Sequence, residues 1–364
     1  MKKVILLHRY LINKGGAERV VIDDNNILLE LGYKSKILCL YRCKKNFSLK
    51  NIDSVLNFNP RNKISKLYGN IKIILKIFIS NPDYLITSSS PILGLFAKLV
   101  GAKIIYLDHH PITMSPLGSL RSYKKIKEKI KQYYPEADNF NLHKIGNNQD
   151  NFLTQIKLFF SYTTYKFYDR VIVLSSYSKK EKNFLLKKSA KISMPFLDEK
   201  FIKFNILKKG IQKKKYILSV SRLHENKNIM SIINGFKKSK LKEHGFKLII
   251  VGDGPLKSKL NKLIKKSDNI EIKGKITDDL LFKLYEESFL FISLQYADFN
   301  LTAVEALLAN CKLIVPNILY LGENNFINKE NITYINNVNS TQEIAKKLIK
   351  ISNLFSYETI YCNK

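Results

Sequence analysis

Long apolar runs are absent from this sequence of 364 residues. The first apolar run, residues 4–7, is too short for the hydrophobic core of a signal peptide. The most apolar later stretch, residues 71–80, is interrupted by Lys72 and Lys76 and is much shorter than the roughly 20 residues that span a bilayer. We therefore expect no transmembrane segment, and peripheral attachment to a membrane stays open.

Cysteine is also scarce. The sequence has only four cysteines, Cys39, Cys43, Cys311 and Cys362, whose spacing fits neither a disulfide framework nor a zinc site. We expect them to be reduced thiols in a cytoplasmic protein.

Acidic residues are few as well. The chain has 62 Lys and Arg against 30 Asp and Glu, which leaves a formal net charge of +32. Such a field attracts nucleic acid, anionic lipid or phosphorylated substrates. The positive residues are mostly Lys and are spread through nearly every segment, whereas specific phosphate and base recognition favours Arg. We expect no specific nucleic acid partner, and charge-driven nucleic-acid binding with a steep salt dependence remains an alternative.

The length predicts two domains, each large enough to bury a core of its own. We place an N-terminal domain at residues 1–207 and a Lys-rich linker at 208–215. A C-terminal domain then covers residues 216–352, followed by a short tail, 353–364.

The pattern of short β-branched runs alternating with helical periodicity predicts an α/β fold with parallel strands. Expected strands are residues 4–7, 35–40, 84–87, 103–107 and 170–174, then 216–220, 247–251, 270–272, 289–292 and 312–315. Expected helices are residues 17–31, 92–100, 179–187, 228–238, 255–265, 277–287, 302–310 and 341–352. Two doubly wound, Rossmann-like domains of this kind bind ligands at the carboxyl ends of their strands, so we expect the site in a central cleft between them.

Two sequence features at such strand ends suit an anion. Gly15 and Gly16 stand between the first strand and its helix, where backbone N–H groups can approach an anion, although a glycine pair at this place is more often just a turn. Arg222 and Lys227 follow the strand 216–220, five residues apart, and suit either a diphosphate or a solvated basic loop.

Two further strand ends carry polar residues. In VGDGP, residues 251–255, we expect a tight turn with Asp253 as a cap and Pro255 in the first helical turn. In residues 296–306, Glu305 is expected in the first turn of an apolar helix. A carboxylate there can bind both hydroxyls of a ribose or simply complement the helix dipole.

These segments, in the order GGAERV, DHHP, SRLHENKN, VGDGP and YADFNLTAVEALLANCKLIV, resemble glycosyltransferase family 4, the retaining enzymes of the GT-B fold. The resemblance covers nearly the whole chain. Each motif is weak alone, but five in this order are jointly specific.

The resemblance implies that the N-terminal domain, 1–207, is the acceptor side and that the C-terminal domain, 216–352, binds the nucleotide-sugar donor. The first Gly-rich loop and the Arg and Lys of an RLxxxK motif contact the donor diphosphate in that family, and the Glu after an FGL-like segment binds the ribose. The matching positions here are Gly15, Gly16, Arg222, Lys227, Phe299, Asn300, Leu301 and Glu305. Many family members need no metal, and we expect neither a metal nor another cofactor.

The resemblance also implies catalytic residues and shows departures. His109 is the first choice for the His near the donor sugar, with His110 second and a turn feature as the other reading. The family's Glu-x7-Glu pattern has Ala297 in place of its first Glu, and Asp298 is the candidate substitute. Asn300 and Asn310 stand where Gly is usual, and Asn310 suits a helix C′ position.

The implied reaction is retaining transfer of a hexose such as mannose, glucose or GlcNAc. The donor would be a GDP- or UDP-sugar and the acceptor a glycan or a lipid-linked glycan. The alternative is a catalytically degenerate GT-B protein that binds nucleotide-sugar, or nothing, and acts as a partner subunit.

Residues 121–134 show apolar and aromatic residues at helical spacing among lysines. With residues 71–79, this segment either faces an anionic bilayer at the inner side of the membrane or packs on its own domain. We expect a cytoplasmic protein in both cases.

Overall fold

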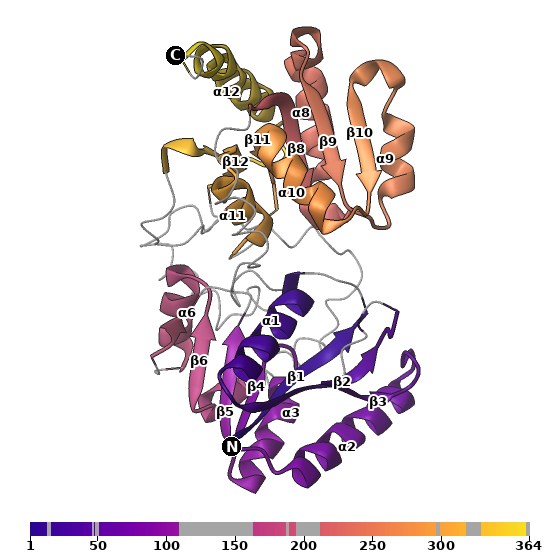
Figure 1. Ribbon diagram of the computed structural model, residues 1–364, viewed down its shortest axis with the longest axis vertical. Helices are drawn as coiled ribbons and strands as arrows, with labels where there is room; N and C mark the ends of the chain where they lie inside the picture. Colours follow the sequence, from indigo (N-terminus) through magenta and orange to yellow (C-terminus); the bar gives the residue numbers. More distant parts are fainter. Residues whose placement is uncertain are drawn as a thin grey trace. The chain divides into compact units, whose positions relative to one another are not determined.

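The computed structural model describes residues 1–12, 16–45, 47, 51–108, 163–186, 189–193, 212–295, 299–317 and 329–361, with the backbone alone at 184–186 and 356–361. The described residues fall into two compact units, unit 1 up to residue 193 and unit 2 from residue 212. Each unit is a parallel sheet with helices packed on both faces (Figure 1), as the alternating pattern predicts.

Unit 1 is built on a seven-stranded parallel sheet in the order β3-β2-β1-β4-β5-β6-β7. Its strands are β1 (Lys3–Leu11), β2 (Lys34–Arg42), β3 (Ile52–Leu56), β4 (Tyr84–Thr87), β5 (Lys103–Asp108), β6 (Arg170–Val173) and β7 (Lys191–Ile192). Because β1 pairs with both β2 and β4, the direction in which strands are added reverses beside β1.

The helices of unit 1 follow the alternation of side chains along β1. Leu6 packs with Val21 of α1 on one face, whereas Ile5 and Leu7 pack with Ile73 of α2 on the other. The described helices here are α1 (Gly16–Glu30), α2 (Lys63–Ser80), α3 (Pro91–Leu95), η1 (Phe96–Val100), η6 (Thr164–Phe167) and α6 (Ser176–Leu186).

Unit 2 has a six-stranded parallel sheet in the order β10-β9-β8-β11-β12-β13. Its strands are β8 (Lys214–Val220), β9 (Lys247–Val251), β10 (Ile270–Gly274), β11 (Ser288–Ile292), β12 (Lys312–Pro316) and β13 (Ile332–Ile335). Its described helices are η7 (Glu225–Lys227), α8 (Ile229–Ser239), η8 (Leu241–His244), α9 (Lys257–Leu263), η9 (Lys266–Asp268), α10 (Asp278–Glu287), α11 (Leu301–Leu308), η10 (Lys329–Asn331) and α12 (Thr341–Tyr361). Ile217 of β8 joins the core under α8 and α12, and its neighbour Leu218 joins the core under α10 and α11.

Several elements differ from the sequence expectation. Strands β3, β7 and β13 and the whole of helix α2 were not predicted, and β8 begins at Lys214, inside the range expected as linker. Helix α12 continues to Tyr361 rather than ending at residue 352. Helix α2 begins earlier than its apolar run because Asn62 caps it, accepting a hydrogen bond from the Ser65 N–H at 2.7 Å.

Asparagine takes the left-handed backbone positions that glycine often fills. Asn81, Asn228, Asn269 and Asn310 all have positive φ. The prediction of Asn310 as a C′ residue is confirmed, because its N–H bonds the Leu307 carbonyl at 2.9 Å and the next N–H, of Cys311, bonds the Ala306 carbonyl at 2.9 Å. This pair of bonds is a Schellman motif, which ends α11.

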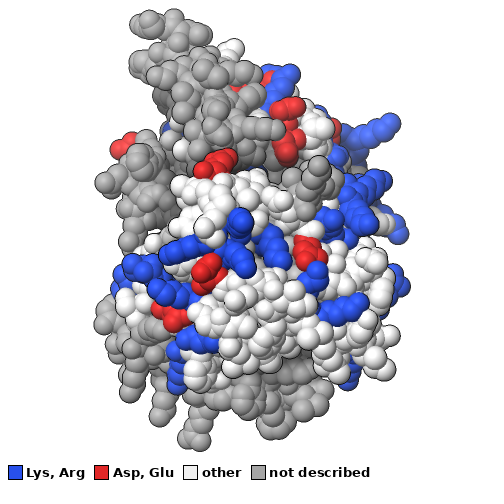
Figure 2. Space-filling model, turned by 60° about the horizontal axis from the view of Figure 1, so that its bottom comes forward, with Lys and Arg blue, Asp and Glu red and all other residues white. Residues whose placement is uncertain are grey.

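On the face shown in Figure 2, Lys and Arg side chains surround uncharged areas, with fewer acidic side chains between them. None of the described helices is both long and apolar enough to span a bilayer.

Helix α2 gives a matched test of the core. Ile73 is fully buried, whereas Ile71, two residues earlier, is 49% exposed. We expect Ile73→Ala to lower the free energy of unfolding by about 2–5 kcal/mol through lost contacts and a cavity. Ile71→Ala should change it by no more than about 0.5 kcal/mol. Urea denaturation followed by circular dichroism measures both, and equal losses would contradict this packing of α2.

Candidate functional site

The candidate site lies at the carboxyl edge of the unit 2 sheet, where β8 pairs with β11. These are the first and fourth strands of the unit, so the strand order reverses between them. Doubly wound sheets bind ligands at such a point, because the loops leaving the two strands diverge there. The loop after β8 carries Arg222 and Lys227, and the segment after β11 carries Gln295 and Asn300.

Hydrogen bonds join these two segments. The Lys227 ammonium donates to the side-chain oxygen of Gln295. The Asn228 side-chain amide donates to the Leu294 carbonyl at 2.7 Å. The structure therefore brings the predicted cation Lys227 against the segment that follows β11. Gln295 was not predicted, since nothing in the sequence marks it beyond its place after a strand.

The electrostatics of the loop after β8 suit an anion. Burial and, to a lesser extent, the nearby charge of Arg222 together lower the pKa of Lys227 to about 8. Lys227 is thus mostly protonated at neutral pH, and an anion beside it would favour its charged form. The Arg222 side chain is exposed, so its guanidinium is accessible to a ligand.

The glycines of VGDGP allow two loops to touch backbone to backbone. Gly252 has φ +134°, and a Cβ there would lie 1.8 Å from the Ser221 carbonyl oxygen. A Cβ on Gly254 would lie 2.5 Å from the Leu223 carbonyl oxygen. The Leu223 N–H also donates to the Asp253 carbonyl at 3.0 Å. This contact holds Leu223 in the core and leaves Arg222 facing outward.

Two expectations for this turn are wrong. Helix α9 begins at Lys257 with Leu256 as its N-cap, so Pro255 precedes the helix rather than entering its first turn. Asp253 does not cap α9, because its carboxylate accepts from the adjacent Gly254 N–H at 2.9 Å. The close loop contact, rather than the helix, determines this turn.

Asn300 is the N-cap of α11. Its buried side chain accepts from the Ala303 N–H and the Thr302 hydroxyl, the latter at 2.8 Å, and donates to the Ser293 hydroxyl at 3.0 Å. Its φ of −125° lies outside the left-handed region that favours glycine. An asparagine is therefore compatible with this position, and it supplies the cap of the helix. Phe299 and Leu301 flank it, half-buried, and Phe299 packs on the core under α11.

Glu305 lies in the second turn of α11, not the first, because the Asn300 cap starts the helix at Leu301. Its side chain is 2% exposed, and its Oε2 accepts from the Tyr285 hydroxyl of α10 at 3.0 Å. The carboxylate is therefore oriented by a buried partner. Ribose binding by Glu305 stays a prediction.

Unit 1 has its own polar carboxyl edge, where β1 pairs with β4. His8 Nδ1 lies 3.4 Å from the Ser88 hydroxyl, and burial lowers the pKa of His8 to about 4, so the ring is neutral at neutral pH. The Arg9 N–H donates to the Ser89 hydroxyl at 2.8 Å. The run of three serines that follows the strand at 84–87 is the sequence signal for this edge. These serines were not among the predicted site residues.

Gly16 is the first residue of α1 and is exposed. A Cβ built on it meets nothing within 4 Å, so no packing in the described structure requires glycine there. A glycine without a packing role at a helix N-terminus is compatible with close approach of an anion.

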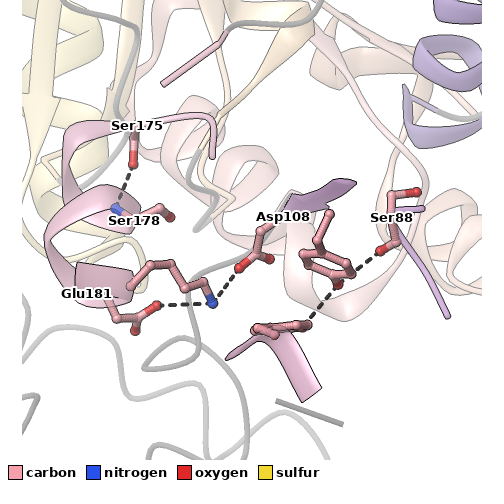
Figure 3. A network of polar contacts seen from close by, with 8 residues as sticks. Ser88, Asp108, Ser175, Ser178 and Glu181 are labelled. Carbon is pink, nitrogen blue, oxygen red and sulfur yellow. Dashed lines mark hydrogen bonds and ion pairs between the residues drawn. The ribbon is translucent and has the colours of Figure 1, made fainter. Parts of the chain in front are cut away.

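A buried charged network lies at the ends of β5 and β6 (Figure 3). Asp108, the last residue of β5, is ion-paired with Lys182 of α6, whose ammonium also lies 3.8 Å from the Glu181 carboxylate. Lys182 and Glu181 are fully buried. The Lys182 ammonium lies 5.1 Å from the centre of the Tyr165 ring, which extends the network to η6. The sequence reasoning missed it, because its members are far apart in the chain.

Several predicted residues lie outside the described part of the structure. They are Gly15, His109, His110, Ala297, Asp298 and the segment 121–134. Among the residues that are described, no group of three or more His, Cys, Asp or Glu side chains is arranged to hold a metal ion.

Residues 198–355, the greater part of unit 2, match the family described as glycosyl transferases group 1. A segment of 100 residues is 36% identical to an uncharacterized glycosyltransferase of Methanocaldococcus jannaschii, and it covers 27% of this chain and 24% of that protein. The chain thus spans about a quarter of that relative.

Solved structures resemble the whole chain. HepE of Anabaena in complex with UDP-glucose has a TM-score of 0.65 at 13% identity, covering 97% of this chain and 91% of that one. WaaG, a glycosyltransferase involved in lipopolysaccharide biosynthesis, has a TM-score of 0.64 at 13% identity, covering 99% and 93%. The chain has the GT-B fold, and the family match over unit 2 supports a glycosyltransferase.

The charged network of unit 1 yields a stability prediction. Lys182→Ala removes one member of a buried ion pair and leaves Asp108 buried without that cation, which we expect to cost about 3–5 kcal/mol of unfolding free energy. Lys98 pairs with Asp169 at 3.4 Å on the surface, so Lys98→Ala should cost about 1 kcal/mol or less. Chemical denaturation of both variants measures the difference, and a Lys182→Ala variant as stable as Lys98→Ala would refute the buried pair.

Proposed function

We propose that this protein is a retaining glycosyltransferase of family 4. It transfers a hexose from a nucleotide-diphosphate sugar to a glycan or lipid-linked acceptor. The observation that carries the proposal is the pairing of Lys227 with Gln295, beside Arg222, at the point of unit 2 where the strand order reverses. The family match over residues 198–355 supports it.

In this proposal the two cations stabilise the leaving diphosphate. Negative charge grows on the phosphate oxygens as the glycosidic bond breaks, and fixed positive groups nearby lower the energy of that state. Arg222 is exposed and fork-shaped, whereas Lys227 is a partly buried point charge held by Gln295. Together with the N–H groups at Gly15 and Gly16, these side chains would stabilise the diphosphate without a metal.

Glu305 is the proposed ribose ligand, and its bond to Tyr285 orients the carboxylate before a donor binds. Phe299, Asn300 and Leu301 form the segment that leads to it, with Asn300 anchored by three hydrogen bonds. This anchoring would limit the reorganisation needed on donor binding.

His109 is proposed to lie beside the donor sugar, with Asp298 in place of the family's first Glu. His109 directly follows Asp108, whose carboxylate is fixed by Lys182. The ion pair therefore anchors the backbone one residue before the proposed catalytic His.

A UDP-sugar is the first donor to test, because HepE was solved with UDP-glucose, and GDP-mannose is the second. The involvement of WaaG in lipopolysaccharide biosynthesis supports a glycan or lipid-linked acceptor. The place we propose for the reaction is the cytoplasmic face of a membrane.

Calorimetric titration with UDP and GDP tests the donor site. Arg222→Gln and Lys227→Gln should each weaken binding of the preferred nucleotide about tenfold to a hundredfold, because each removes a charge-assisted contact to phosphate. Lys259→Gln on the exposed side of α9 removes the same charge and should leave the affinity unchanged. Equal losses in all three variants would mean that only the overall charge matters.

The pH dependence of that affinity isolates Lys227. In the free protein Lys227 loses its proton as the pH rises through about 8, whereas a bound diphosphate keeps the proton on. UDP affinity should therefore fall by up to about tenfold between pH 7 and pH 9. In Lys227→Gln the fall should be much smaller, and an undiminished fall would exclude Lys227 from the site.

The second candidate function, a degenerate GT-B protein acting as a partner subunit, is favoured by Ala297 at the position of the family's first Glu. For an active transferase, Ala297→Glu should raise transfer by up to about 10²-fold by restoring a contact to the donor sugar. Proton NMR of the product should show the anomeric configuration of the donor. No transfer by either protein would favour the partner subunit, and inversion would overturn the retaining assignment.

A further inference from the structure

Helix α2 presents apolar side chains on two opposite faces. Its inner face, formed by Gly69, Ile73 and Ile77, is buried against the sheet of unit 1. Its outer face carries large apolar side chains that are between 39% and 80% exposed. These residues, called the outer stripe, are Ile64, Leu67, Tyr68, Ile71, Leu75, Phe78 and Ile79.

The spacing of the outer stripe is helical. Successive members are one, three or four residues apart, which at about 100° per residue keeps them within about 60° of one line along the helix. The inner residues fall on the opposite side of the same helix. A continuous apolar stripe that stays exposed in the described part of the chain marks an interaction surface rather than scattered exposure.

The charged residues of α2 itself all have one sign. Helix α2 has four lysines and no acidic residue. The Lys72 ammonium lies 4.5 Å from the centre of the Tyr68 ring, at one edge of the stripe, and Lys63 is exposed at the start of the helix. Lys76 pairs with Asp53 at 3.1 Å on the sheet side. Long lysine side chains can lie along apolar surface and extend their ammonium groups to a polar boundary.

We propose that α2 docks this protein on an anionic lipid bilayer. The helix lies parallel to the membrane surface, with the outer stripe at the level of the headgroups and upper acyl chains. Lys63 and Lys72 meet the lipid phosphates. The chemistry of the stripe fits this partner, because a lipid surface provides apolar and anionic groups along the whole length of a helix. The net charge of +32 favours approach to the same surface.

This docking surface involves unit 1 alone and needs neither donor nor acceptor. Its test is therefore separate from that of the proposed transferase activity.

The sequence contains no tryptophan, so a single introduced tryptophan reports its own surroundings. In Ile71→Trp we expect a blue shift and higher intensity on adding vesicles of phosphatidylglycerol and phosphatidylcholine. Leu31→Trp, at an exposed position just after α1 on the other face of the sheet, should show no such change. A shift in both variants, or in neither, would overturn the proposal.

Vesicle sedimentation gives the affinity. The natural chain should bind the mixed anionic vesicles at least about tenfold more tightly than phosphatidylcholine alone, and added salt should weaken binding. Ile64→Gln with Ile79→Gln removes two side chains that are each 80% exposed and should weaken binding by about tenfold or more. Leu31→Gln with Leu354→Gln, also exposed, should not.

Lysine variants distinguish docking through α2 from attraction of vesicles by the net charge of the whole chain. Lys63→Gln with Lys72→Gln should weaken vesicle binding more than Lys259→Gln with Lys262→Gln, which removes the same charge from α9. Equal effects would overturn the proposal in favour of long-range attraction.

Two results would identify another occupant of the stripe. A dimer in sedimentation velocity that Ile64→Gln with Ile79→Gln dissociates would assign it to a second copy of this chain. Blue-shifted Ile71→Trp fluorescence with RNA but not with vesicles would assign it to nucleic acid.

Discussion

The parallel pairing of β8 with β11 is the constraint on which the candidate site depends. It joins segments that are more than sixty residues apart in the sequence and makes their carboxyl ends neighbours. Lys227 can meet Gln295, and Asn228 can meet Leu294, only because of this pairing. The conformation of each loop is then refined locally, by an asparagine cap after β11 and by a glycine-dependent loop contact after β8.

The two units support their carboxyl edges in different ways. In unit 2 the support is largely backbone to backbone, and it requires residues without a Cβ at Gly252 and Gly254. In unit 1 side chains predominate, with serine hydroxyls beside His8 and a buried ion pair between Asp108 and Lys182. Backbone contact fixes position with little dependence on pH or salt. A buried ion pair fixes the orientation of its two side chains, since removing either one would leave the other charge buried without its partner, at a large cost in free energy.

Much of the fold could be predicted from local pattern, because buried parallel strands are short apolar runs and helices have their own period. Even Asn310 could be assigned, since a left-handed helix end is a local requirement. The errors came where a distant contact decides the outcome. The turn at Asp253 follows the loop beside it rather than α9, and the network around Lys182 depends on strand pairing. The sequence left open whether residues 71–79 face a bilayer or pack on their own domain. The outer stripe of α2 forms one apolar run with the inner face, and periodicity alone does not show which side is covered.

The outer stripe and the high net charge together govern how the protein behaves as a colloid. At low ionic strength a charge of +32 keeps copies apart over distances longer than the reach of apolar contacts. In molar salt the screening length shrinks to about 3 Å, and the repulsion no longer covers the stripe. Conditions that release the chain from a cation exchanger are therefore those that favour its self-association. A mild detergent, which covers the stripe without screening the charge, suits its handling better than added salt.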